Sequence, residues 1–145
     1  MKFLILNGPN LDMLGRREPG VYGSRTLKEI NASLDGYAKG LGITLDFFQS
    51  NAEGELIEKI HSVLEEYDGC AINAGAYTHY SYAIRDAIAA VDRPFVEVHM
   101  SNVHSRETFR HASVISPVCC GVIAGFGEKS YSLAVSALRD IVLGK

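Results

Sequence analysis

The sequence has few cysteines, no excess of basic residues and no long hydrophobic run, and each shortage argues against a class of protein. Its 145 residues carry a formal net charge of −3, so nothing points to a face that binds nucleic acid. The longest nearly apolar run, residues 117–126, is about half as long as the roughly twenty residues that a membrane-spanning helix needs. We therefore expect neither a nucleic-acid partner nor a membrane partner.

The three cysteines form neither a disulfide framework nor a zinc-binding pattern. Cys119 and Cys120 are adjacent, and Cys70 lies in a separate apolar run. At the N-terminus, one lysine and a short apolar run are too little for a secretory signal peptide. These features predict reduced thiols and a cytoplasmic location.

Two nucleotide-binding motifs and the usual metal-binding spacing are also missing. The sequence contains neither G-x-G-x-x-G nor G-x-x-x-x-G-K-[ST], so nothing supports a dinucleotide site or a P-loop. The histidines do not show the paired spacing H-x-x-x-H that helical metal sites use.

Strand-like segments alternate with helical patterns along the chain. The strand-like segments are mostly continuous apolar runs, which is typical of parallel strands covered on both faces. Because the two kinds alternate, we predict an α/β fold with one catalytic domain over residues 1–145. We expect a flavodoxin-like three-layer sandwich with a five-stranded parallel sheet in the order 2-1-3-4-5. The predicted strands are 2–7, 43–49, 69–73, 94–99 and 117–125, and the predicted helices are 27–39, 56–66, 79–91 and 130–143.

The most informative segment joins the first predicted strand to the first helix. Residues 7–24 read NGPNLDMLGRREPGVYGS, about three times as long as the upper end of usual connections. Four glycines are spaced among Asn10, Arg16, Arg17 and Tyr22. Glycines let a loop fold tightly or swing as a lid, and long loops with specific polar groups tend to cover active sites. We expect a lid over residues 10–25.

Polar residues follow three of the predicted strands at their carboxyl ends. They occupy residues 7–10 after the first strand, 73–75 after the third and 97–99 at the end of the fourth. In open α/β sheets, ligands bind beyond the carboxyl ends of the strands, where the strand order reverses. The sequence therefore predicts that three distant segments converge on one crevice.

Glu97 and His99 are the candidate acid pair. Two residues apart on a strand, they share one face of the sheet. A carboxylate beside an imidazole selects its tautomer and raises its basicity, which suits a histidine that donates a proton. A strand-end histidine paired with a purely structural carboxylate fits the spacing equally well. Met100 and Ser101 follow and offer backbone N–H groups for a ligand carboxylate.

Tyr22 is a candidate base, although an ordinary tyrosine ionises near pH 10. A lid arginine in a site closed to water would favour the phenolate, which requires roughly 4 kcal/mol of differential stabilisation at pH 7. A packing residue that anchors the loop is the alternative. Arg106 and Arg110 are four residues apart, so a helical turn would place them on one side. There they would fit an anionic or polyhydroxy substrate, or a solvated face paired with Glu107.

His79 and Asp86 lie seven residues apart in the third predicted helix, so we expect them on one face of it. They fit a contact with ligand, a contact with a neighbouring subunit, or an ordinary surface pair.

Five motifs, in this order and spacing, resemble type II 3-dehydroquinate dehydratases. They are NGPNL, LGRREPGVYG, NAGAYTH, EVHMSNVHSRETFRHAS and SPVCCGVIAGFG, and the resemblance runs from about Leu4 to Ala137. It implies a flavodoxin-like fold, no metal or cofactor, and a dodecamer of four trimers. The implied reaction is loss of water from 3-dehydroquinate to give 3-dehydroshikimate, in the shikimate route to aromatic amino acids.

The resemblance also implies roles for the catalytic residues. Tyr22 would take the C2 proton, with Arg17 holding it as phenolate. Asn10 would position a water that stabilises the enolate. His99, oriented by Glu97, would protonate the departing C1 hydroxyl.

Further residues would bind the substrate, as the resemblance implies. Its carboxylate would be received by Asn73, Met100 and Ser101, the last two partly through backbone N–H groups. Its ring hydroxyls would be held by His79 and Arg110. Asp86 would reach in from the adjacent subunit, and Arg106 would help to order the lid.

Four positions depart from the family pattern. Asp12 and Ala52 replace an asparagine and a histidine, while Tyr80 and Tyr82 replace smaller residues where they can alter a subunit contact or the substrate rim.

Two other functions compete with the dehydratase. A flavin-binding electron carrier would need a Ser/Thr-rich phosphate loop, which the first loop lacks. A receiver-like signalling domain would need an aspartate at the end of the third strand, where residue 73 is asparagine.

Overall fold

The computed structural model describes residues 1–16 and 18–145 and places five parallel strands in one sheet. The strand order is β2-β1-β3-β4-β5, which confirms the predicted order. The strands are β1 (Lys2–Asn7), β2 (Thr44–Gln49), β3 (Gly69–Asn73), β4 (Phe95–His99) and β5 (Gly121–Ala124).

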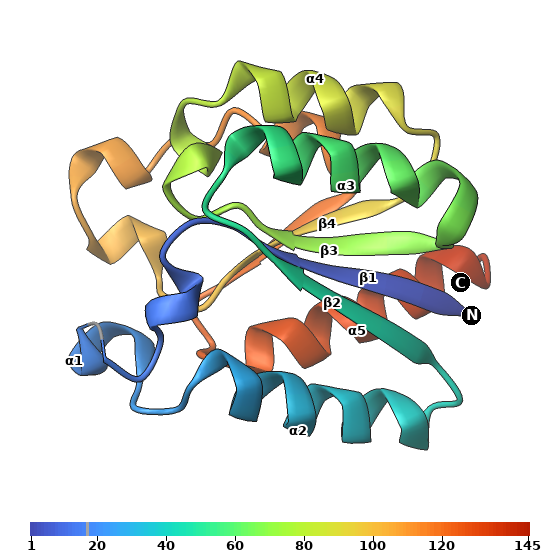
Figure 1. The fold of residues 1–145 in the computed structure, drawn as a ribbon, viewed down its shortest axis with the longest axis horizontal. Helices are drawn as coiled ribbons and strands as arrows, with labels where there is room; N and C mark the ends of the chain where they lie inside the picture. Colours follow the sequence, from blue (N-terminus) through green and yellow to red (C-terminus); the bar gives the residue numbers. More distant parts are fainter. Residues whose placement is uncertain (17) are drawn as a thin grey trace.

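Two pairs of helices cover the two faces of the sheet (Figure 1). Helices α2 (Leu27–Gly40) and α5 (Lys129–Val142) lie on one face, and α3 (Glu53–Glu66) and α4 (Tyr82–Ala90) lie on the other. The interior strand β1 contributes to both layers, because successive side chains of a strand point to opposite faces. Its residues Phe3 and Ile5 pack with α2 and α5, while Leu4 and Leu6 pack with α3 and α4, and all four are fully buried.

The ends of three elements differ from the predicted ends for local reasons. Helix α3 begins three residues early, at Glu53, where acidic side chains in the first turn favour a helix N-terminus. Strand β5 begins late, because the 3-10 turn η5 (Ser116–Val118) precedes it and has Pro117 near its start. Helix α4 begins at Tyr82 because Ser81 caps it, with the Ile84 N–H donating to the Ser81 hydroxyl over 3.0 Å.

This late start of α4 corrects one prediction. His79 belongs to the separate 3-10 turn η2 (Gly75–His79), so His79 and Asp86 do not share a helical face. The physical reason is that the non-helical backbone of Tyr80 and the extended backbone of the Ser81 cap interrupt the helical pattern.

Short helical turns fill the long loops at the carboxyl edge of the sheet. The loop after β1 holds the 3-10 turn η1 (Leu11–Met13) and the short helix α1 (Pro19–Tyr22). The loop after β4 holds η3 (Val103–Ser105) and η4 (Thr108–Arg110). In Figure 1 both loops lie at the same end of the molecule, opposite the chain termini.

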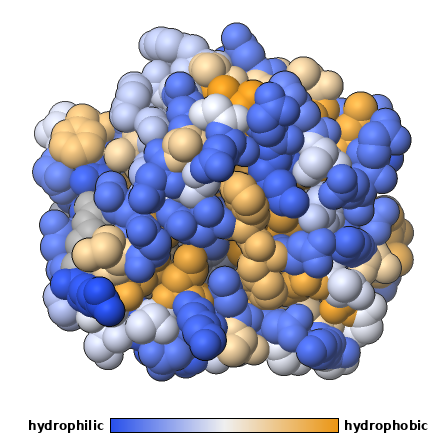
Figure 2. All heavy atoms as spheres, viewed as in Figure 1, coloured by the Kyte–Doolittle hydropathy of each residue, from blue (hydrophilic) through white to orange (hydrophobic). Residues whose placement is uncertain are grey.

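One face of the molecule is mainly polar, and its helices are typical of a globular domain in length. Figure 2 shows one face as mainly hydrophilic, with apolar side chains gathered in the middle, where Figure 1 has the edge strand β2. Across residues 1–16 and 18–145, none of the helices combines the length and apolarity needed to cross a membrane.

Candidate active site

A cleft opens where the carboxyl ends of β1, β3 and β4 meet, as the sequence predicts. It encloses about 490 Å³ of space, including its open mouth. Most of the predicted site residues line it: Asn10, Tyr22, Asn73, His79, His99, Met100, Ser101, Arg106 and Arg110.

Two of the described site residues do not line the cleft. Glu97 is buried behind His99 and touches the cleft only through it. Asp86 is exposed on α4 and does not line the cleft of its own chain. Arg17 lies outside the described residues.

The loops after β1 and β3 touch backbone to backbone. The Gly8 N–H donates to the Asn73 carbonyl over 2.8 Å, and a Cβ on Gly8 would lie 2.6 Å from the Ala74 carbonyl oxygen. Gly75 has a φ of 59°, a conformation that side chains disfavour, and a Cβ there would lie 3.0 Å from the Pro9 carbonyl oxygen. These two glycines therefore let the polar residues of both loops share one cleft.

Asn10 is held in an unusual backbone conformation. Its φ is 69°, in the left-handed region that asparagine tolerates better than most residues. Its N–H donates to Asn51 Oδ1 over 3.0 Å, and Gln49 Nε2 donates both to Asn51 Oδ1 and to the Gly8 carbonyl, each over 3.1 Å. The segment after β2 thus supports the loop that carries Asn10.

A buried hydrogen-bond chain orients the Asn73 amide. The Tyr131 hydroxyl donates to Asn7 Oδ1 over 2.5 Å and accepts from Asn73 Nδ2 over 3.0 Å, while Asn73 Oδ1 accepts from the Gly75 N–H over 3.2 Å. Burial raises the pKa of Tyr131 well above its ordinary value of 10, so its hydroxyl stays a donor at neutral pH. The chain directs the second Asn73 N–H away from Tyr131.

His99 is paired with Glu97 inside the protein. His99 Nε2 lies 2.6 Å from Glu97 Oε2, and the two residues are 6% and 1% exposed. Burial raises the pKa of Glu97, but hydrogen bonds from His99, Ser116 and Ser113 outweigh it, and the pKa lies below its ordinary value of 4.5. An ionised Glu97 can only accept, so Nε2 carries a proton and Nδ1 is the ring nitrogen left to act on a ligand.

His79 stacks beside His99 with a ring-centroid distance of 6.3 Å. Its Nδ1 lies 2.8 Å from the Ala112 carbonyl and must donate to it, because a carbonyl has no proton to give. Burial is the main cause that lowers the pKa of His79 below 6.5, with contributions from His99 and Arg110. A neutral His79 therefore presents Nε2 as an acceptor for a hydroxyl group.

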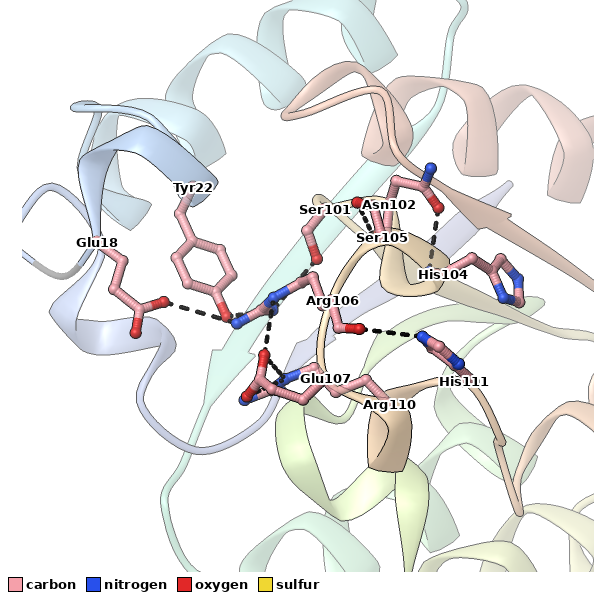
Figure 3. Close-up of polar contacts among 10 residues, drawn as sticks. All are labelled: Glu18, Tyr22, Ser101, Asn102, His104, Ser105, Arg106, Glu107, Arg110 and His111. Carbon is pink, nitrogen blue, oxygen red and sulfur yellow. Dashed lines mark hydrogen bonds and ion pairs between the residues drawn. The ribbon is translucent and has the colours of Figure 1, made fainter.

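Tyr22 lies against Arg106 at the mouth of the cleft (Figure 3). Arg106 Nη1 donates to the Tyr22 hydroxyl over 2.6 Å, and the guanidinium carbon lies 5.0 Å from the ring centroid. The same guanidinium reaches Ser101 Oγ at 3.3 Å and Glu18 Oε2 at 3.6 Å. Arg106 therefore joins α1 and its N-cap Glu18 to the loop after β4.

The two arginines of the loop after β4 face the cleft and also lie near a carboxylate. Arg106 and Arg110 line the cleft, and both contact Glu107, at 3.7 Å and 3.2 Å. They do not lie on one helical turn, because Arg106 follows η3 in an extended conformation and Arg110 belongs to η4.

Sequence patterns do not identify several residues that support the site. Tyr131 reads as part of an apolar helical stripe, and nothing local marks its hydroxyl as a partner of the first and third strands. Ser113 and Ser116 lie within or beside a recognised motif, yet their bonds to Glu97 depend on a chain reversal that no local pattern shows. An alignment of many relatives would be the signal able to find such residues.

Comparisons with known proteins place this arrangement in a family. The family model described as "Dehydroquinase class II" matches residues 1–139. A protein of Bacillus pumilus named 3-dehydroquinate dehydratase is 57% identical over 136 residues, covering 94% of this chain and 92% of its own.

Solved structures give the same result. The type II dehydroquinase of Butyrivibrio crossotus is 48% identical and superposes with a TM-score of 0.94, covering 96% of this chain and 97% of its own. The type II dehydroquinase of Propionibacterium acnes is 41% identical, with a TM-score of 0.91 and coverage of 98% and 96%. None of these relatives supports the flavin-binding alternative.

Proposed function

This chain belongs to the class II dehydroquinase family, and from that membership we infer that it removes water from 3-dehydroquinate to give 3-dehydroshikimate. It is then a hydro-lyase of the shikimate pathway, which leads through chorismate to the aromatic amino acids. The observation that carries the proposal is the pairing of His99 with Glu97 in one cleft with Tyr22 and Arg106, since an elimination needs an acid and a base.

Tyr22 is the proposed base, which takes the C2 proton of the substrate. A phenol can do so only as phenolate, and the Arg106 guanidinium supplies a positive charge 2.6 Å from the hydroxyl oxygen. The family motif assigns this task to Arg17, and Arg106 would add to it. Figure 3 shows Arg106 between Tyr22 and Ser101, so it can also hold the lid over bound substrate.

Loss of the C2 proton leaves an enolate, whose oxygen carries the developing charge. Asn10 is the proposed residue that positions a water against this oxygen, and its left-handed conformation and the bond to Asn51 hold it ready before the substrate arrives. Donors that are already oriented need no rearrangement as the charge develops, so they stabilise the transition state more than the substrate.

His99 is the proposed acid that protonates the departing C1 hydroxyl. Because its Nε2 proton is held by Glu97, His99 acts as the acid in its doubly protonated form and gives up the proton on Nδ1, which leaves the neutral ring with its Nε2 proton. Base and acid come from different elements, Tyr22 from α1 and His99 from β4, so the proton can leave one face of the substrate ring while the hydroxyl leaves the other. This arrangement supports an anti-elimination.

The remaining cleft residues are proposed to bind the substrate. Asn73, with Met100 and Ser101 partly through backbone N–H groups, would receive the carboxylate. His79 Nε2 is an acceptor suited to a ring hydroxyl, and Arg110 lies beside it in the cleft. We propose no metal and no cofactor, since donors and cations of the chain account for each charge that develops.

The assembly and the location of the enzyme follow from the same family membership. We propose a dodecamer of four trimers, in which Asp86 reaches the cleft of the adjacent subunit, as its exposure on α4 allows. The exposed Tyr80 and Tyr82 precede it by six and four residues and would alter that contact or the substrate rim. We propose the cytoplasm as the location, since Cys70, Cys119 and Cys120 are all free thiols.

Turnover of 3-dehydroquinate is the decisive experiment. The purified protein should produce the ultraviolet absorption of a conjugated enone, and the rate should be the same after treatment with a chelator. A chelator-sensitive rate would refute the metal-independent mechanism. A yellow protein that lacks turnover would favour the flavin carrier instead.

A further inference from the structure

Two serine hydroxyls contact the carboxylate that pairs with His99. Ser113 Oγ lies 2.9 Å and Ser116 Oγ 2.6 Å from Glu97 Oε1, while His99 occupies Oε2. Ser113 precedes η5 and Ser116 begins it, so both come from the segment that returns from the lid side of the cleft to β5. The buried carboxylate therefore has donors on both of its oxygens.

The direction of these bonds is determined by the other partners of Ser113. Its oxygen accepts the backbone N–H groups of Ile115, over 3.2 Å, and Ser116, over 3.0 Å. A hydroxyl oxygen has two lone pairs and one proton. With both lone pairs used, the Ser113 proton must go to Glu97, so this position favours an ionised carboxylate and not a protonated one.

The charged and titratable groups around Glu97 and His99 determine how much the serine donors contribute to keeping Glu97 ionised. From η2, His79 stacks on His99 and is held neutral; from η4, Arg110 brings a positive charge into the same cleft. After η5, burial raises the pKa of Cys119 to about 12, so this thiol brings no charge at neutral pH. His99 and the two serines are thus the groups in direct contact with Glu97 that favour its ionised form.

We propose that Ser113 and Ser116 are positioning residues for the acid step: they hold Glu97 ionised and in place so that His99 keeps its Nε2 proton and delivers a proton from Nδ1. Neither serine is among the residues that line the cleft, so both act through Glu97. This inference rests on the proposed dehydratase function for its effect on rate, although its effect on Glu97 is independent of turnover.

Ser116→Ala is the cleaner test, because Ser113 also accepts two backbone N–H groups at the start of η5 and its removal would disturb the local fold. The titration of Glu97 would be followed by ¹³C NMR on protein labelled at glutamate, with the signal assigned through Glu97→Gln. Without the Ser116 proton, the midpoint of Glu97 should rise by roughly one unit. Ser116→Thr keeps the hydroxyl and should restore the wild-type midpoint.

Kinetics would then connect the carboxylate to catalysis. In Ser116→Ala, the acidic limb of the kcat–pH profile should move up by the same roughly one unit, so that kcat at acidic pH falls up to about tenfold relative to wild type. KM at pH 7 should equal the wild-type value. Ser132→Ala, which removes an exposed hydroxyl bonded to the Lys129 carbonyl on α5, is the matched control and should leave both profiles unchanged.

The outcomes separate the two proposals. A Glu97 midpoint and an acidic limb that both stay at their wild-type positions, with only thermal stability reduced, would show that the serine has a structural role and would overturn the inference. A midpoint that moves in a protein without turnover would support the serines and reject the dehydratase function.

Discussion

Replacing Tyr131 by phenylalanine removes one buried oxygen and leaves two polar groups without their partner. Asn7 Oδ1 loses a donor and Asn73 Nδ2 loses an acceptor, in a region where Tyr131 is 1% exposed and Asn7 is equally buried. Each buried polar group left without a hydrogen bond costs about 1–3 kcal/mol. We therefore expect the free energy of unfolding to fall by about 3 kcal/mol.

Thermal unfolding followed by circular dichroism would measure this loss. For a chain of this length, 1 kcal/mol corresponds to about 3 °C in Tm, so Tyr131→Phe should unfold roughly 10 °C below wild type. Because Asn73 also loses the group that orients its amide, KM for 3-dehydroquinate should rise more than kcat falls. A variant that merely unfolds more easily would show wild-type KM at low temperature.

Tyr37→Phe is the matched control for the same chemical change. Its hydroxyl bonds to Ser136 Oγ over 2.7 Å and joins α2 to α5, but Tyr37 is 42% exposed and water can replace the lost partner. We expect its Tm within about 2 °C of wild type. If the two variants have equal Tm values, the loss at Tyr131 does not come from leaving its buried hydrogen-bond partners unsatisfied, and the reasoning is refuted.

Three further predictions follow from the site. Tyr22→Phe should lower kcat by about 10²–10⁴-fold with the fold intact by circular dichroism, and near-normal kcat would reject Tyr22 as the base. Gly8→Ala should lower the urea midpoint of unfolding, because its Cβ would lie 2.6 Å from a backbone oxygen that cannot move freely; an unchanged midpoint would contradict this close approach. Since the pKa of Glu97 is lowered in the fold, its ionisation contributes stability above its unfolded value near 4.5. Ser116→Ala should therefore be less stable than wild type at pH 7, and the difference should shrink as pH falls below that value; a constant difference would contradict it.

Much of the fold was readable from the sequence because its signals are local. Continuous apolar runs separated by helical patterns predict a parallel sheet whatever the rest of the chain does. Thr26 and Glu29 form a capping box at the start of α2, with the Glu29 N–H donating to Thr26 Oγ1 over 3.2 Å; the pattern T-x-x-E is visible in the sequence because all its atoms lie within one helical turn. The convergence of the loops after β1, β3 and β4 follows from strand direction alone.

Contacts between distant segments were decided only by the tertiary structure. The bond from Arg106 to Tyr22 spans 84 residues, and the bond from Tyr131 to Asn7 spans 124. The local spacing of Arg106 and Arg110 misled in one respect, because it suggested a common helical turn that the chain does not form.

The sequence by itself determined which residue types stand at the ends of the strands, and therefore where the site lies and which chemistry is available there. The tertiary structure decided that Arg106 meets Tyr22, which oxygen of Glu97 meets His99 and which hydroxyls hold the other oxygen. The physical reason is range: propensity and periodicity act over a few residues, whereas a hydrogen bond depends on ångström-scale placement of groups that only the packed chain brings together.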